Sequence, residues 1–77
     1  MRSSYILARE REAEELIRTG QEQQAAELCD VIAEYYSGEE ANCDAAGESA
    51  EGMRASRAAE FWSARARELR GRGQAPL

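Results

Sequence analysis

Apolar positions in the first quarter of the chain recur with the 3.6-residue period of an amphipathic helix, which predicts a helix over residues 4–18. The apolar face is formed by Tyr5, Ile6, Ala13, Leu16 and Ile17. Gly20 follows at once and suits the left-handed conformation that ends a helix. Thr19 and Glu22 have the spacing of a capping box, which predicts that a second helix starts here.

The second apolar stripe has the clearest helical period in the chain and predicts a helix over residues 21–36. Its members are Ala25, Leu28, Cys29, Ile32, Tyr35 and Tyr36. Two helices of nearly equal length joined by so short a turn must run antiparallel. The first half of the chain is therefore expected to form a helical hairpin.

Ser37 and Glu40 repeat the spacing of a capping box, and Gly38 eases a reversal, so a third, longer helix is predicted over residues 39–70. Along it, a seam with a mean spacing of 3.5 residues favours close helix packing. The seam comprises Ala41, Ala45, Glu48, Gly52, Ala55, Ala59, Trp62, Ala66 and Leu69. Gly47 and Gly52 each cost about 1 kcal/mol inside a helix, so a break near residues 43–52 stays open. Residues 71–77 are expected to form a flexible tail.

These patterns predict an all-α fold, a three-helix bundle in a single domain over residues 1–70. A chain of 77 residues with so few large apolar side chains has a small core, which favours self-association as a homodimer. The expected association seam consists of Ala55, Ala59, Trp62, Ala66 and Leu69, with Phe61 on its flank beside Arg54, Arg57 and Arg65. The alternative is that the seam packs on the hairpin of the same chain.

The acidic and basic residues are distributed unevenly along the chain. The net charge is −5, and no basic residue lies between positions 21 and 52. The acidic surface expected there comprises Glu27, Asp30, Glu34, Glu39, Glu40, Asp44, Glu48 and Glu51. Six of the ten arginines follow after residue 52. A surface of one sign attracts a partner of the opposite sign.

The residue types argue against catalysis. The chain has no histidine, and a cysteine nucleophile normally needs an adjacent base. Cys29 lies on an apolar stripe and is expected to be buried, whereas Cys43 is expected to be at least half exposed. The two thiols lack a metal-ligand pattern, and the carboxylates lack the spacing of a calcium loop. We therefore expect no enzyme, no metal and no cofactor.

Three function classes remain. The first is stoichiometric protein–protein binding, as an adaptor or structural interaction module. The second is inhibition of a nucleic-acid-handling host system through the acidic surface, since the chain resembles anti-CRISPR and anti-restriction proteins of phages and plasmids in size and charge only. The third is nucleic-acid binding through the C-terminal arginines. This class is disfavoured because the net charge is negative and the arginines scatter around the helix.

The chain shows no signal-peptide pattern at its N-terminus and no apolar run of about 20 residues that would span a bilayer. We therefore expect a cytoplasmic protein with no membrane partner.

Overall fold

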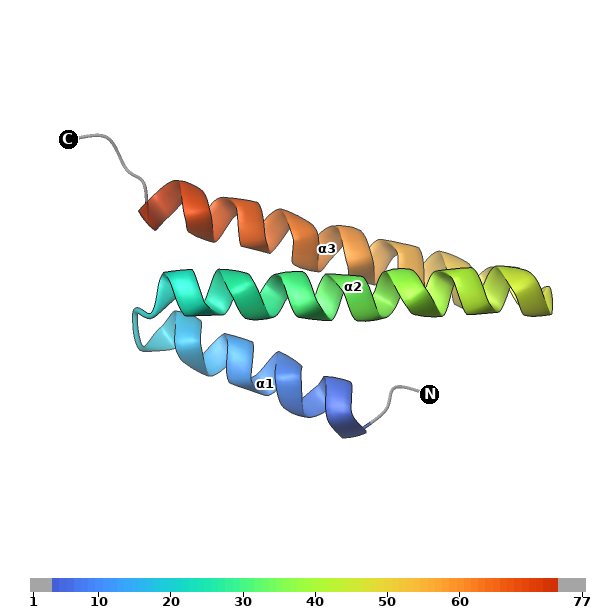
Figure 1. Ribbon diagram of the computed structural model, residues 1–77, viewed down its shortest axis with the longest axis horizontal. Helices are drawn as coiled ribbons and strands as arrows, with labels where there is room; N and C mark the ends of the chain where they lie inside the picture. The colour runs from blue at the N-terminus through green and yellow to red at the C-terminus, as the bar shows by residue number, and fades with distance from the viewer. Residues whose placement is uncertain (1–3, 74–77) are drawn as a thin grey trace.

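The computed structural model describes residues 4–73 and confirms an all-α, three-helix bundle (Figure 1). Helix α1 spans Ser4–Arg18, α2 spans Glu22–Ala46 and α3 spans Ser49–Gly73. Helix α2 lies in the middle, and α1 and α3 pack on it from either side. None of the described helices is long and apolar enough to cross a membrane.

The first turn forms where the sequence predicts it. Gly20 has a φ of +82°, and the amides of Gly20 and Gln21 donate to the carbonyls of Ile17 and Leu16. This pair of bonds is a Schellman motif, which satisfies carbonyls that the end of α1 leaves free. The predicted capping box is wrong, because the Thr19 hydroxyl turns back to the α1 carbonyls of Glu15 and Leu16.

The second turn does not lie at residues 37–38, where the sequence analysis places it. Ser37 and Gly38 are inside α2, which continues to Ala46. The chain reverses instead at Gly47, whose φ is +77°, within the region left open for a break. Here the amides of Gly47 and Glu48 donate to the carbonyls of Asp44 and Cys43. Both turns therefore use the same Schellman chemistry.

This change of boundary makes α2 and α3 equal in length, at 25 residues each. The third helix is therefore not the longer one. A reversal at residue 38 would have left half of a long third helix without a neighbour, whereas equal helices cover each other from end to end. Helix α3 also continues to Gly73, so residues 71–73 belong to it. The rest of the predicted tail, residues 74–77, lies outside the described residues.

Gly52 lies where α2 and α3 approach closely near their shared turn. A Cβ atom built on Gly52 would lie 3.1 Å from a carboxylate oxygen of Asp44 and 3.5 Å from the Cβ of Cys43. The missing side chain thus leaves room for the end of α2. This close approach explains why a glycine sits inside α3.

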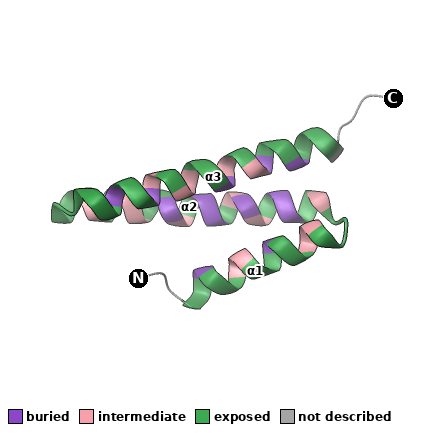
Figure 2. Ribbon diagram, turned by 180° about the vertical axis from the view of Figure 1, so that it is seen from behind, coloured by how far each residue is buried: buried purple, intermediate pink, exposed green. Residues whose placement is uncertain are grey.

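The core is rich in alanine, and the buried residues follow α2 along its inner side (Figure 2). Its members are Ile6, Ala13, Ala25, Ala26, Cys29, Ile32, Ala33, Tyr36, Trp62, Ala66 and Leu69. No charged side chain is buried within residues 4–73. Small residues let the helices approach, and the large side chains of the core are Trp62, Tyr36, Leu69, Ile6 and Ile32.

Candidate protein-binding surfaces

The predicted association seam lies inside the bundle. Ala55, Trp62, Ala66 and Leu69 are at most 8% exposed, and Ala59 is half-buried. Their neighbour is α2 of the same chain, which is the alternative that the sequence analysis left open. These residues therefore pack α3 against α2, and the four buried ones are almost inaccessible to solvent.

Phe61 differs from the other seam residues, since 54% of it is exposed. Its ring meets the Trp62 ring edge-on at 5.3 Å. The guanidinium of Arg65 lies 5.4 Å from the centre of the Phe61 ring and 5.3 Å from the centre of the Trp62 ring. The edge-on contact with Trp62 and the cation–π contact with Arg65 together orient the exposed ring.

Leu7 of α1 faces this aromatic pair across a groove of about 360 Å³. The groove exists because no Cα atom of α1 comes within 8 Å of one in α3 over residues 4–73. Its charged rim includes Arg65, whose guanidinium lies 2.6 Å from the Glu14 carboxylate. We call Leu7, Phe61, Trp62 and Arg65 the Phe61 patch. Leu7 is not among the residues of the apolar face predicted for residues 4–18, and in the structure it is 38% exposed.

The predicted acidic surface is only partly neutralised by the fold. Asp30 accepts a hydrogen bond from Arg70 at 2.5 Å, and Glu51 pairs with Arg54 at 2.5 Å. The remaining carboxylates have no ion pair within the described part of the chain, namely Glu27, Glu34, Glu39, Glu40, Asp44 and Glu48. Four of these six are exposed, and Glu39 and Glu40 are half-buried.

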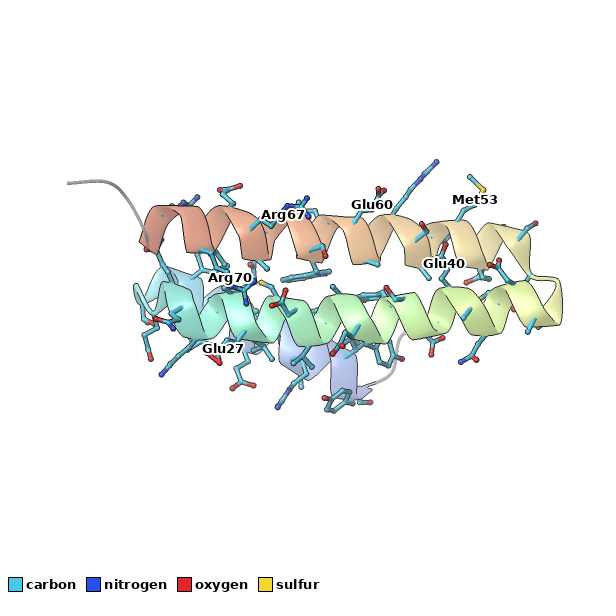
Figure 3. The ribbon with its side chains drawn as sticks, turned by 45° about the horizontal axis from the view of Figure 1, so that its top comes forward. Glu27, Glu40, Met53, Glu60, Arg67 and Arg70 are labelled. Carbon is cyan, nitrogen blue, oxygen red and sulfur yellow. The ribbon has the colours of Figure 1, made fainter. Side chains whose placement is uncertain are left out.

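The C-terminal arginines are mostly occupied by carboxylates of the same chain. Arg70 pairs with Asp30, and Arg72 lies 2.5 Å from Glu68 and 3.5 Å from Glu22. The contact with Asp30 raises the pKa of Arg70 above its ordinary value, first through the hydrogen bond and then through charge. Arg67 projects from α3 on the side away from α2 (Figure 3). Within residues 4–73, Arg54, Arg65, Arg70 and Arg72 therefore each have a carboxylate partner from the same chain.

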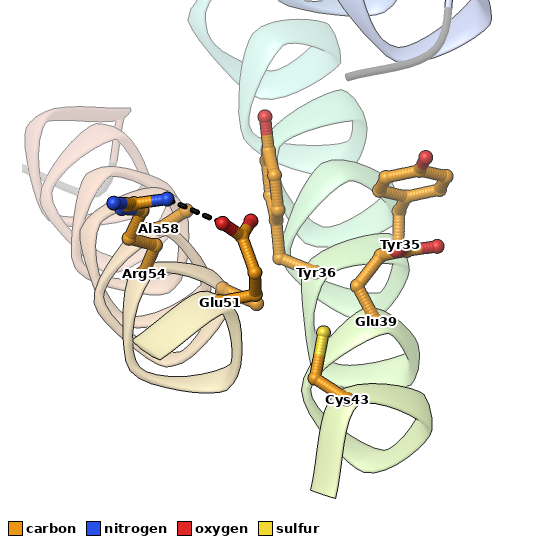
Figure 4. Close-up of a pocket in the computed structure, with 8 residues that line it drawn as sticks. Tyr35, Tyr36, Glu39, Cys43, Glu51, Arg54 and Ala58 are labelled. Carbon is orange, nitrogen blue, oxygen red and sulfur yellow. Dashed lines mark hydrogen bonds and ion pairs between the residues drawn. The ribbon is translucent and has the colours of Figure 1, made fainter. Parts of the chain in front are cut away.

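A second groove, of about 450 Å³, lies between α2 and α3 and was not predicted (Figure 4). It is lined by Tyr35, Tyr36, Glu39, Cys43, Glu51, Arg54, Ala55 and Ala58. It borders the end of α1, which reaches it through the ring contact of Tyr5 with Tyr35 and the hydrogen bond from Tyr36 to Glu10. Helix α1 has 15 residues and α2 has 25, so the distal parts of α2 and α3 extend past it.

Both cysteines are free thiols. Cys29 is fully buried, and burial raises the pKa of its thiol. Cys43 is half-buried, and its pKa is also raised, first by desolvation and then by the charges of Glu48 and Glu39. A raised pKa keeps both groups as neutral thiols at pH 7, the less nucleophilic form. No cluster of three potential metal ligands forms within residues 4–73.

No family model matches the chain, and no characterised protein or solved structure is significantly similar to it.

Proposed function

We propose that this protein acts by stoichiometric binding to another protein chain, with the Phe61 patch as the contact surface and without catalysis. The observation that carries the proposal is the exposure of Phe61, whose ring is 54% open to solvent although Trp62 and Arg65 hold it in place. Aromatic side chains, phenylalanine among them, and arginine are enriched at protein–protein interfaces.

The patch is suited to binding because its parts are already ordered. Immobilising a flexible side chain at an interface costs about 0.5–1.5 kcal/mol. Arg65 would lose little further freedom on binding, because it already contacts two rings and the Glu14 carboxylate. The buried seam residues support the patch by packing α3 against α2. Their role in the proposal is to position Phe61.

Affinity capture with matched bait variants tests the proposal. A wild-type bait should retain a protein in a fixed molar ratio, and Phe61→Ser should lose at least about tenfold in affinity, because truncating a hot spot costs about 2 kcal/mol. Met53→Ser is the control, since Met53 is 58% exposed and points away from α2 (Figure 3). Equal retention by both variants would refute the patch as the contact surface.

A second candidate function uses the acidic surface as a competitor for a basic, nucleic-acid-binding groove on a host protein. It is supported by the six carboxylates of α2 and the following turn that have no ion pair in the described residues. Such binding is electrostatic, so it should weaken steeply between about 50 and 200 mM salt. The triple variant Glu39→Gln, Glu40→Gln, Asp44→Asn should abolish it, whereas Phe61→Ser should not. Salt-insensitive binding would exclude this candidate.

A further inference from the structure

We propose that the groove between α2 and α3 binds a short, positively charged amphipathic helix of another protein chain. This groove, of about 450 Å³, shares no lining residue with the Phe61 patch, so the inference adds a second binding surface to the proposed function. We call it the α2–α3 groove. Three observations support this occupant: the end of α1 beside the groove, the small apolar residues of its lining, and its uncompensated negative charge.

The α2–α3 groove lies on the side of α2 on which α1 packs, at the point where α1 ends. Tyr36 lines the groove and donates a hydrogen bond to Glu10 of α1. Cys43 follows Tyr36 by seven residues, which places both on one side of α2. Residues 37–46 of α2 continue past Tyr36 and span about 15 Å. A helix of about ten residues has the length of this segment, which α1 leaves without a third helix.

The lining of the α2–α3 groove suits the apolar face of a helix (Figure 4). Tyr36 and Ala55 are buried at its floor, and Tyr35, Cys43 and Ala58 are half-buried. The small residues come from both helices, so they leave space between α2 and α3 for the side chains of a third helix. An amphipathic helix occupies such a groove with apolar side chains at positions i, i+3 and i+7.

The charge around the groove favours a basic occupant. Glu39 lines the groove, and Asp44 and Glu48 lie near the turn that joins α2 to α3. None of these three carboxylates has an ion pair within the described part of the chain. Arg54 also lines the groove, but it pairs with Glu51 at 2.5 Å, so these two charges compensate each other. The charge that remains is negative.

The thiol of Cys43 senses this negative charge from the lining of the groove. Its pKa is raised first by desolvation and then by the charges of Glu48, Glu39, Glu51 and Asp44. A negative potential that disfavours a thiolate favours a cation at the same place. Lysine or arginine beside the apolar face of the bound helix therefore meets opposite charge.

The three described helices of this chain do not offer such a basic apolar face to a second copy. The arginines are concentrated in the C-terminal half of α3, where Trp62, Ala66 and Leu69 are buried against α2. Arg70 and Arg72 in that half already have carboxylate partners. The occupant is therefore a helix of a different chain.

A designed peptide tests the groove directly. The probe is a fluorescein-labelled peptide of about 14 residues, with leucine at positions i, i+3 and i+7 and with lysine and alanine elsewhere. Fluorescence anisotropy at about 50 mM salt should show saturable binding to the full-length chain. A peptide with glutamate in place of lysine, and one with serine in place of leucine, should each bind at least about tenfold more weakly, because one lacks the opposite charge and the other the apolar face. The serine peptide separates binding in the groove from binding by charge alone.

Matched variants of the protein locate the bound probe. Glu39→Gln removes a carboxylate from the lining and should weaken binding about three- to fivefold. Glu34→Gln removes an exposed carboxylate of α2 outside the groove and should leave binding unchanged. Ala58→Arg should weaken binding at least about tenfold, because it adds bulk and positive charge to the lining. Saturating probe should slow the alkylation of Cys43 by iodoacetamide at least about fivefold, since the peptide covers the thiol. Circular dichroism checks that each variant remains helical.

Every outcome decides the proposal. Binding that needs both lysine and leucine, responds to Glu39→Gln but not to Glu34→Gln, and protects Cys43 supports it. A failure to saturate up to about 1 mM, equal weakening by the two glutamine variants, or an unprotected Cys43 overturns it. Phe61→Ser should bind the probe as wild type does, and a loss of binding in this variant would assign the probe to the Phe61 patch. The capture experiment with Phe61→Ser tests the proposed function independently of this result.

Discussion

The carboxylate of Glu14 in α1 lies 2.6 Å from the guanidinium of Arg65 in α3, and this ion pair crosses the groove between two helices whose backbones do not meet. The same guanidinium stacks on Phe61 and Trp62. Arg65 therefore joins the outer helices of the bundle and orders the exposed aromatic ring. Because it is 28% exposed, its contacts are only partly screened by water.

Arg65→Ala should lower the free energy of unfolding by about 1–2 kcal/mol, since it removes two cation–π contacts and one ion pair. Glu14→Gln should cost at most about 1 kcal/mol, because it removes only the ion pair. Urea unfolding followed by circular dichroism measures both changes. If the two variants were equally destabilised, the stacking of Arg65 would contribute nothing.

Gly38→Ala and Gly47→Ala should change stability in opposite directions. Gly38 lies within α2, and nothing lies within 4 Å of the Cβ that alanine would add, so the variant should gain about 1 kcal/mol from helix propensity. Gly47 has a φ of +77°, where alanine costs about 1–2 kcal/mol. In a domain of this size, thermal unfolding should shift by about 4–8 °C per kcal/mol. A destabilised Gly38→Ala would indicate that the chain turns at residues 37–38.

Ala66→Leu should destabilise the fold by about 1–3 kcal/mol, because Ala66 is fully buried and overpacking a tight core is costly. The control is Ala64→Leu, which adds the same atoms two residues away at an exposed position. This change should stay within about 0.5 kcal/mol. Thermal melts at one protein concentration compare the two. Equal melting temperatures would contradict the tight packing of α3 on α2.

Cys43 should react with Ellman's reagent in the folded protein, and Cys29 should react only in denaturant, because Cys29 is fully buried. Partial burial and neighbouring carboxylates raise the pKa of Cys43, so less thiolate is present at pH 7.5. The reaction rate should therefore increase with pH over a higher pH range than it does for free cysteine.

Glu48 is the largest charge contribution to the pKa of Cys43. Glu48→Gln should therefore lower that pKa and speed the reaction at pH 7.5. Glu60→Gln, on the outer side of α3, should leave the rate unchanged. An unchanged rate in Glu48→Gln would show that the charge of Glu48 does not slow the thiol.

The local pattern of residues was sufficient for the fold class and for α1. Apolar residues at helical spacing marked Ser4–Arg18 correctly, and Gly20 ended the helix because only glycine reaches the left-handed region without strain. These are properties of neighbouring residues, so the sequence alone determines them. The predicted seam was right only in part: Ala55, Trp62, Ala66 and Leu69 are buried, whereas Ala41, Ala45 and Glu48 are exposed.

The end of α2 was decided by packing. Gly38 and Gly47 both had the residue type needed for a turn, and the local signals at Ser37 and Glu40 favoured the first. Continuation to Ala46 lets α2 cover the whole of α3 and lets Gly52 approach Asp44 and Cys43. This packing energy comes from residues far apart in the sequence. The residues around Gly38 therefore do not reveal it.

The same reason separates the buried seam from the exposed patch. Phe61 and Trp62 are consecutive residues of α3, so helical periodicity placed them on neighbouring faces of the helix. Only the position of α2 decides that Trp62 is buried while Phe61 is left open beside Arg65. The sequence by itself determined which residues share a face of a helix. The tertiary structure decided which face was used within the chain, because burial depends on what the rest of the molecule brings to it.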